Sequence, residues 1–146
     1  MDYADDEVIA DVLNDSHLWF VVGLRDNPAR AAYGVARMLQ DIGKQVVPIH
    51  PAAERVHGAT GYPTIALAAA EVGAPDVVDI FVRSDLAGPV IDEAITAGAG
   101  AVWLQLGVID LDAAARATNA GLDVVMDRCP AIEWPRAAAG RHRGAE

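Results

Sequence analysis

A loop with one glycine and two arginines is the part of this sequence best suited to bind an anion. Gly23 follows the apolar run 18–22, and Arg25 and Arg30 lie in the polar segment that comes next. Glycine lets the backbone turn sharply against a ligand, and a helix beginning near Ala32 would point free N–H groups at the same place. Guanidinium groups bind phosphate oxygens through paired hydrogen bonds. The loop predicts a phosphate site, although a simple turn with two solvated arginines would use the same residues, because one glycine is weaker than a G-x-G-x-x-G motif.

The residues at the end of the second apolar run, Ile49-His50-Pro51, indicate which kind of nucleotide the site could bind. A site for NAD usually has Asp or Glu at this position to bind the ribose hydroxyls, and here the position holds none. The G-x-x-x-x-G-K-[ST] motif of a P-loop does not occur either. His50 is interpreted as a contact for an adenosine phosphate or as a residue that only ends the strand.

Two further apolar runs end in polar residues that would reach the same edge of a sheet. Arg83 follows the third run, where it would bind phosphate or pair with Asp85. Gln105 and Gly107 follow the fourth run, and they would offer amide groups and a close approach of the backbone. These residues extend the predicted site beyond the first loop.

The segment from Asp127 to Glu133 contains a thiol, an arginine and two carboxylates, and it resembles a catalytic cluster. A nucleophilic thiol needs a base or cations beside it. The histidines are dispersed along the chain, at His17, His50, His57 and His142. We therefore interpret Arg128 as the partner of Asp127 or Glu133 and Cys129 as a small packed hydrophobe, and we expect no catalytic residue and no metal site.

Strands and helices alternate along the chain, which is typical of βαβ units with a parallel sheet. The apolar runs predict strands over 18–22, 45–49, 76–82, 100–104 and 122–126. Helical spacing and end signals predict helices over 5–14, 33–42, 86–97 and 112–120, and we expect one short helix near 65–72 in the less regular stretch 51–75. Right-handed crossovers leave few arrangements, and we expect a three-layer Rossmann-like α/β fold whose five-stranded parallel sheet has the order 3-2-1-4-5. The ligand would then lie over the carboxyl ends of the first and fourth strands, at the switch point.

Length and charge limit the classes of protein that this chain can belong to. Its 146 residues suit one domain, expected over 1–136, with a disordered tail over 137–146. The net charge of −10 argues against nucleic acid or an anionic membrane as partner, because both need a cationic face. No apolar run reaches the roughly 18 to 20 residues of a membrane-spanning helix, and the acidic start is unlike a signal peptide. A single cysteine fits a reducing compartment, so we expect a cytoplasmic protein.

Five blocks of the sequence match a family of known proteins. They are Gly23-x-x-Asp26-x-Pro28-x-Arg30-x-x-Tyr33-x-Val35, Val46-Val47-Pro48-Ile49-x-Pro51, Asp79-x-Phe81-x-Arg83, Trp103-Leu104-Gln105-Leu106-Gly107-Val108 and the run from Val124 to Glu133. Together they resemble the small stand-alone CoA-binding proteins, which are similar to the N-terminal CoA-binding domain of the succinyl-CoA ligase alpha subunit. The resemblance extends from about Asp5 to Pro135.

The resemblance implies that the cofactor is coenzyme A or an acyl-CoA, lying across the strand ends of a Rossmann-type fold. The contacts that it implies, together with the strand ends named above, are Gly23, Leu24, Arg25, Asn27, Arg30, Tyr33, His50, Pro51, Phe81, Val82, Arg83, Gln105 and Gly107. Two positions depart from the family, which usually has Ser at the place of Arg25 and often a small hydroxyl residue at that of Ala32. The absence of both hydroxyl groups weakens the phosphate site unless the positive charge of Arg25 replaces their hydrogen bonds. The phosphorylated histidine of the ligase belongs to a second domain, so ligase activity is not implied.

We therefore expect a non-catalytic protein that binds CoA or an acyl-CoA, with a homodimer or a partner subunit left open. One alternative is a nucleotide-dependent enzyme, either an NAD-type reductase or a CoA-using enzyme with Cys129. Another is an interaction subunit without a ligand. The absent carboxylate after the second strand disfavours the reductase, and Gly23, Arg30 and Arg83 disfavour loss of the ligand.

Overall fold

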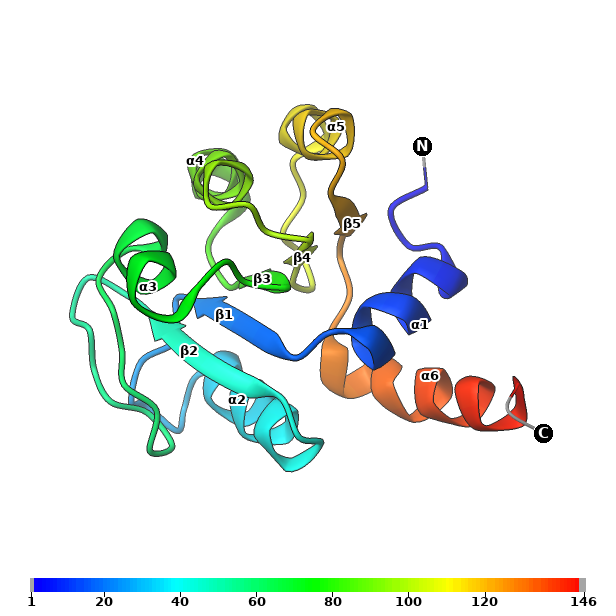
Figure 1. Ribbon diagram of the computed structural model, residues 1–146, viewed down its shortest axis with the longest axis horizontal. Coiled ribbons are helices and arrows are strands. Elements are labelled where there is room, and N and C mark those ends of the chain that lie inside the picture. Colours follow the sequence, from blue (N-terminus) through cyan, green and yellow to red (C-terminus); the bar gives the residue numbers. More distant parts are fainter. Residues whose placement is uncertain (1, 145–146) are drawn as a thin grey trace.

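The computed structural model describes the backbone of residues 2–144 and the side chains of residues 2–140. Its helices are α1 (Asp6–Asp15), α2 (Ala31–Asp41), α3 (Ile65–Val72), α4 (Ser84–Thr96), α5 (Leu111–Asn119) and α6 (Pro130–Gly144). Its strands are β1 (Leu18–Val22), β2 (Gln45–Ile49), β3 (Val77–Ile80), β4 (Ala101–Leu104) and β5 (Asp123–Val125) (Figure 1). Each expected strand and helix is present, and β3 is shorter than the predicted strand 76–82.

The five strands are parallel and lie in the order β2-β1-β3-β4-β5. The three-layer Rossmann-like α/β class is confirmed, but the order differs from the expected 3-2-1-4-5 in the place of β3. This strand pairs with β1, for example Val78 with Phe20, and not with β2. Ile65 and Ala68 of α3 enter the core on the face opposite α2, so the right-handed crossover from β2 returns over β1. The switch point therefore lies between β1 and β3, and not between the first and fourth strands.

Helices cover both faces of the sheet (Figure 1). One face packs against α3, α4 and α5, and the other packs against α1, α2 and α6. Side chains of β1 alternate between the two cores, with Phe20 in the first and Trp19 and Val21 in the second. Trp19 also contacts Trp103 of β4, with 5.9 Å between ring centroids. Burial of each such large side chain contributes about 1.5–3 kcal/mol relative to exposure, which explains why the central strands are apolar on both faces.

Ser84 is the first residue of α4, and its Oγ accepts from the N–H of Ile109 and donates to the carbonyl oxygen of Gly107. It thereby ties the start of α4 to the loop after β4. The expected disordered tail, 137–146, continues α6 as far as Gly144, and Ala137 is buried in the core beside α1. Residues 145–146 lie outside the described part of the chain.

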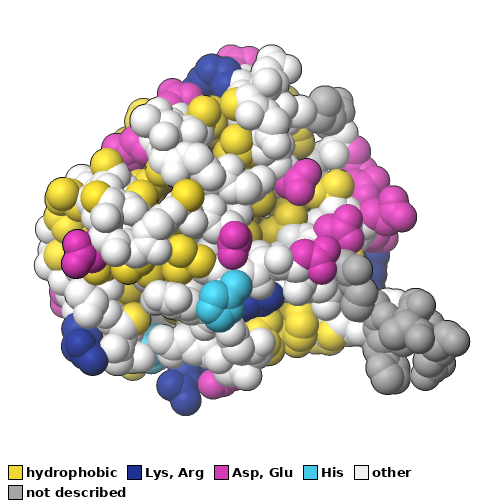
Figure 2. All heavy atoms as spheres, in the orientation of Figure 1, with side chains coloured by type: hydrophobic (Ala, Val, Ile, Leu, Met, Phe, Trp, Pro, Cys, Tyr) yellow, Lys and Arg dark blue, Asp and Glu magenta, His cyan; other side chains and the backbone are white. Residues whose placement is uncertain are grey.

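Acidic residues outnumber basic ones in the sequence, 21 to 11. Figure 2 shows acidic side chains gathered over α1 and basic side chains scattered singly across the same face. The first turn of α1 contains Asp6 and Glu7 and is capped by Asp5. Within the described residues, no helix is both long enough and apolar enough to cross a membrane.

Candidate functional site

A cavity of about 520 Å³ opens at the switch point, over the carboxyl ends of β1 and β3. Open α/β sheets bind their ligands at this place, because the loops after the two strands diverge to opposite faces. The lining combines three arginines, a histidine, a glycine and apolar side chains. Its residues are Gly23, Arg25, Arg30, Ala31, Ala32, His50, Phe81, Val82, Arg83 and Leu86, and we call it the crevice cavity.

Gly23 brings the first loop directly against the end of β3. Its φ of 93° lies in the left-handed region, and its N–H donates to the carbonyl oxygen of Ile49 at 2.8 Å. A Cβ at this position would lie 2.6 Å from the carbonyl oxygen of Phe81. Only glycine satisfies both the backbone angle and this contact, so a ligand can approach the bare backbone here.

Helices α2 and α4 start at the crevice cavity, and both lack the side-chain hydrogen bond that caps α1, α3 and α5. Asp5, Thr64 and Asp110 cap α1, α3 and α5 through side-chain oxygens that accept backbone N–H groups. The N-caps of α2 and α4 are Arg30 and Arg83, and neither side chain forms a capping bond. A helix N-terminus without a cap has N–H groups to offer, and it favours negative charge.

The three arginines of the crevice cavity differ in their partners. Arg25 pairs with Glu54 at 2.8 Å, and Arg83 pairs with Asp85 at 3.2 Å. Arg30 has no ion pair among the residues that the structure describes. An arriving anion would therefore meet one guanidinium without a competing carboxylate.

His50 is held in its neutral form beside these cations. Partial burial lowers its pKa, the charge of Arg25 lowers it further, and Glu54 acts in the opposite direction. Its Nδ1 accepts from the N–H of Ala52 at 3.0 Å, so the neutral ring carries its proton on Nε2. The Nε2–H is a hydrogen-bond donor on a residue that lines the crevice cavity.

The structure brings seven of the predicted contacts together in the crevice cavity: Gly23, Arg25, Arg30, His50, Phe81, Val82 and Arg83. Leu24 is buried in the core instead, and Tyr33 contacts the ring of His57, with 4.1 Å between centroids. Asn27 accepts from the N–H of Ala29 within its own loop, and Pro51 is exposed. Their expected roles as contacts stay predictions.

The two predicted contacts after β4 lie outside the lining of the crevice cavity. Gln105 is 6% exposed, and its Oε1 has no hydrogen-bond partner among the described residues. Gly107 has a φ of 78°, and its N–H donates to Asp127 Oδ1 at 2.7 Å. A buried acceptor without a partner is costly, so Gln105 is the better candidate to receive a donor from a ligand.

Sequence reasoning missed three residues at or beside the site. Ala31 and Leu86 line the crevice cavity together with Ala32, which the sequence had placed near the start of the helix, and Glu54 holds Arg25. Ala31 and Leu86 follow from the start points of α2 and α4, which periodicity gives only to within a few residues. Glu54 gave no such signal, because its approach to Arg25 depends on the path of the loop after β2.

Asp79 of β3 is a buried acid on the same face of the sheet as Trp103. It is fully buried, and neither carboxylate oxygen has a hydrogen-bond partner among the described residues. Burial raises the pKa of Asp79 well above its usual value and so favours the protonated, neutral form of the carboxyl group.

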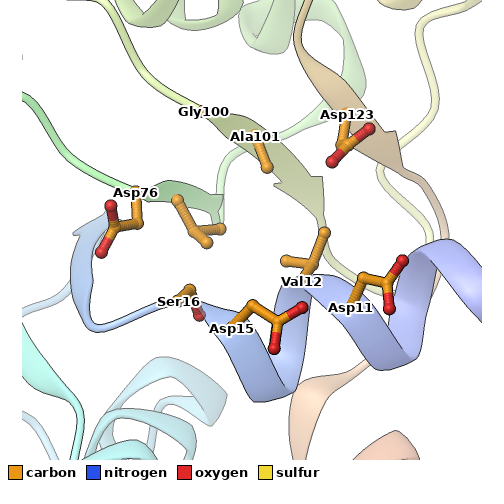
Figure 3. A pocket seen from close by; sticks show the side chains of 9 residues that line it. Asp11, Val12, Asp15, Ser16, Asp76, Gly100, Ala101 and Asp123 are labelled. Carbon is orange, nitrogen blue, oxygen red and sulfur yellow. The ribbon is translucent and has the colours of Figure 1, made fainter.

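A second cavity, of about 390 Å³, lies at the opposite edge of the sheet (Figure 3). Figure 3 shows carboxylates of Asp11, Asp15, Asp76 and Asp123 around it, from α1 and from the amino ends of β3 and β5. Asp76 Oδ2 accepts from the N–H groups of His17 and Leu18, each at 2.8 Å. So many carboxylates repel phosphate, which leaves the crevice cavity as the better anion site.

Cys129 sits just before α6. Its carbonyl oxygen accepts from the N–H groups of Ile132 and Glu133, each at 3.0 Å, and the residue packs against the core that contains Trp103. In the described part of the chain, no three His, Cys, Asp or Glu residues are arranged to hold a metal. Arg128 hydrogen-bonds to the carbonyl oxygen of Asp127 rather than to a carboxylate.

Known proteins with the same sequence pattern and fold were found in three ways. A family model described as "CoA binding domain" matches residues 17–135. The Bacillus subtilis (strain 168) protein YneT, described as uncharacterized, is 30% identical over 122 residues, which cover 83% of this chain and 87% of YneT. Prb, a protein redesigned for binding, superposes with a TM-score of 0.85 at 32% identity, over 94% of this chain and 95% of Prb. A hypothetical protein from Pyrococcus horikoshii OT3 gives 0.84 at 32% identity, over 92% of each chain.

Proposed function

This chain belongs to the CoA binding domain family, and from that premise we propose that it binds coenzyme A or an acyl-CoA in the crevice cavity without catalysing a reaction. The matched range, 17–135, includes every residue that lines the cavity. A volume of about 520 Å³ falls within the roughly 300–1,000 Å³ of small-molecule sites.

The observation that carries the proposal is the pair of arginine N-caps. Arg30 and Arg83 start the two helices that open onto the crevice cavity, and neither helix is capped by a side-chain oxygen. Coenzyme A contains a pyrophosphate and a phosphorylated ribose, and both are dianionic or nearly so. Helix N–H groups, helix dipoles and guanidinium groups all favour such charge, and they do so at one place.

The other residues of the cavity fit the same ligand. Gly23 lines the cavity, and its backbone would lie close to a bound phosphate. His50 would donate its Nε2–H to a phosphate or ribose oxygen, and the apolar atoms of Val82 and Leu86 would pack against the adenine or the pantetheine arm. Gln105 lies outside the cavity lining, and its buried Oε1 would accept from an amide N–H of that arm only where the arm extends past the cavity toward the end of β4.

The absence of a catalytic role is part of the proposal. The groups that line the crevice cavity are cations, one neutral histidine and apolar side chains, which bind and orient rather than attack a substrate. His50 has its Nδ1 bound to a backbone N–H, and Cys129 packs against the core outside the cavity lining. Activation of a nucleophile requires a base within hydrogen-bond reach, and this placement supports a structural use of the thiol.

An NAD-type enzyme is the second candidate, and one observation favours it. Glu54 follows β2 and reaches the first loop, which is the region where dinucleotide folds place the acid for the ribose hydroxyls. That carboxylate is engaged by Arg25, however, and Arg25 would favour a phosphate instead. The balance supports CoA.

Calorimetric titration with CoA, acetyl-CoA, NAD and ATP tests the proposal. We expect CoA and acetyl-CoA to bind more tightly than NAD and ATP. Equal binding of CoA and NAD, or tighter binding of NAD, would overturn it. Sedimentation of the same protein would show whether it is a monomer or a homodimer, and fractionation of cells would test the proposed cytoplasmic location.

A further inference from the structure

Arg25 and Glu54 form an ion pair at the rim of the crevice cavity. Arg25 Nε donates to Glu54 Oε1 at 2.8 Å, across 29 residues of sequence. The side chain of Arg25 is 52% exposed and lines the cavity, and that of Glu54 is 34% exposed behind it. The carboxylate is thus close to the site, but its hydrogen-bonding capacity is partly used by the arginine.

The loop after β2 holds Glu54 in this place. Ala53, the residue before it, has a φ of 49°, and a Cβ at Gly61 would collide with the backbone carbonyl of Glu54. Ala59 and Val56 close a short turn further along the same loop by two backbone hydrogen bonds. The loop therefore fixes the backbone at Glu54, and the ion pair with Arg25 is what holds the carboxylate itself.

The two members of the pair would recognise opposite chemical forms of an adenosine ribose. A carboxylate near the end of β2 accepts hydrogen bonds from free ribose hydroxyls, and an arginine nearby binds a ribose phosphate. A phosphate and a carboxylate repel each other, so both cannot be favoured at once. Whichever group is free to face the ligand sets the preference.

We propose that the Arg25–Glu54 ion pair is the specificity determinant of the crevice cavity, by which the site selects a phosphorylated ribose over a free ribose diol. Arg25 withholds the carboxylate from ribose hydroxyls and presents its remaining N–H groups to the ribose phosphate. This inference rests on the proposed binding of CoA, and it identifies the ribose phosphate as the group by which the site distinguishes its ligand. The electrostatic link to His50 is consistent with it, since Arg25 and Glu54 shift the pKa of that cavity residue in opposite directions.

A pair of ligands that differ in one phosphate gives the sharpest test. CoA and 3′-dephospho-CoA are titrated into the wild type, Arg25→Ser and Glu54→Gln. Arg37→Ser and Asp41→Asn are the matched controls, because they break an exposed ion pair on α2 that lies outside the cavity lining.

The wild type should prefer CoA. Arg25→Ser should weaken CoA by about tenfold or more, the scale of a charge-assisted hydrogen bond, and should strengthen dephospho-CoA because Glu54 is released. Glu54→Gln should keep the preference for CoA and bind it as tightly as the wild type or more tightly. The two controls should leave the ratio of the two affinities unchanged.

The results that contradict the inference differ from those that contradict CoA binding. If the wild type binds CoA but Arg25→Ser weakens both ligands by the same factor, the ion pair does not determine specificity. A Glu54→Gln protein that loses CoA binding while remaining folded by circular dichroism would overturn it as well. If the wild type binds neither ligand, the proposed function fails, and the inference fails with it.

Discussion

Gly23 and Phe81 meet so closely that a Cβ on the glycine would lie 2.6 Å from the carbonyl oxygen of Phe81. This contact joins the loop after β1 to the end of β3, which are the two segments that border the switch point. The φ of Gly23, 93°, is also in the left-handed region. The first loop therefore depends on glycine for both its backbone angle and its place in the sheet.

Replacement of Gly23 by alanine should disturb stability and binding together. The left-handed angle and the collision with Phe81 should lower the free energy of unfolding by about 2–4 kcal/mol, and CoA affinity should fall because the first loop shifts. Urea denaturation and calorimetry measure the two effects. Gly43→Ala is the matched control, since Gly43 has a φ of 91° but no atom within 4 Å of an added Cβ. Equal losses of stability in the two variants would show that the contact with Phe81 has no role.

Replacement of Arg30 by alanine should separate binding from stability. Arg30 is exposed, forms no capping bond and lines the crevice cavity, so its loss should change the free energy of unfolding by less than about 0.5 kcal/mol. CoA binding should weaken by about 1.5–3 kcal/mol, the range for a hydrogen bond to a charged group. Arg37→Ala, on the same helix, should bind CoA like the wild type. An Arg30→Ala protein with unchanged affinity would show that the arginine does not contact the ligand.

Replacement of Asp79 by asparagine should make the protein more stable at high pH relative to the wild type. The folded-state pKa of Asp79 is raised, so above the ordinary pKa the unfolded chain loses this proton first. Between the unfolded-state pKa and the folded-state pKa of Asp79, this group lowers the free energy of unfolding of the wild type by about 1.4 kcal/mol for each unit of pH. Asparagine has no such proton. Denaturation of both proteins between pH 5 and 8 should show a gap that widens in favour of the variant; a gap independent of pH would contradict the protonated state of Asp79.

Replacement of Cys129 by serine should leave CoA binding intact. Cys129 precedes Pro130, the first residue of α6, and its carbonyl oxygen accepts two N–H groups of that helix. Serine is favoured before a helix, so stability should change by no more than about 1 kcal/mol. Iodoacetamide labelling across pH and CoA titration of the variant are the measurements. Rapid labelling of the wild type well below pH 7, with a CoA-dependent turnover that the variant lacks, would favour an enzyme instead.

The identity and type of the elements follow from the sequence by itself. Strand β1 is a run of five apolar residues, and α3 lies where a short helix was expected, near 65–72. Such patterns are local, because a buried parallel strand and an amphipathic helix each require their side chains at fixed spacings. The cationic first loop, with Gly23, Arg25 and Arg30, was visible for the same reason.

The place of β3, the partner of Arg25 and the end of the chain were decided by the tertiary structure. Either order of strands satisfies right-handed crossovers, and the choice depends on the face of the sheet against which α3 packs. Glu54 reaches Arg25 only because the loop after β2 folds back toward the first loop. The two residues are 29 positions apart in the sequence, and no local pattern predicts a contact at that separation. Residues 136–144 continue α6, and Ala137 is buried beside α1, a contact between segments far apart in the sequence. Local patterns decide which segments are regular, but the energies that select among their arrangements come from contacts between segments far apart in sequence.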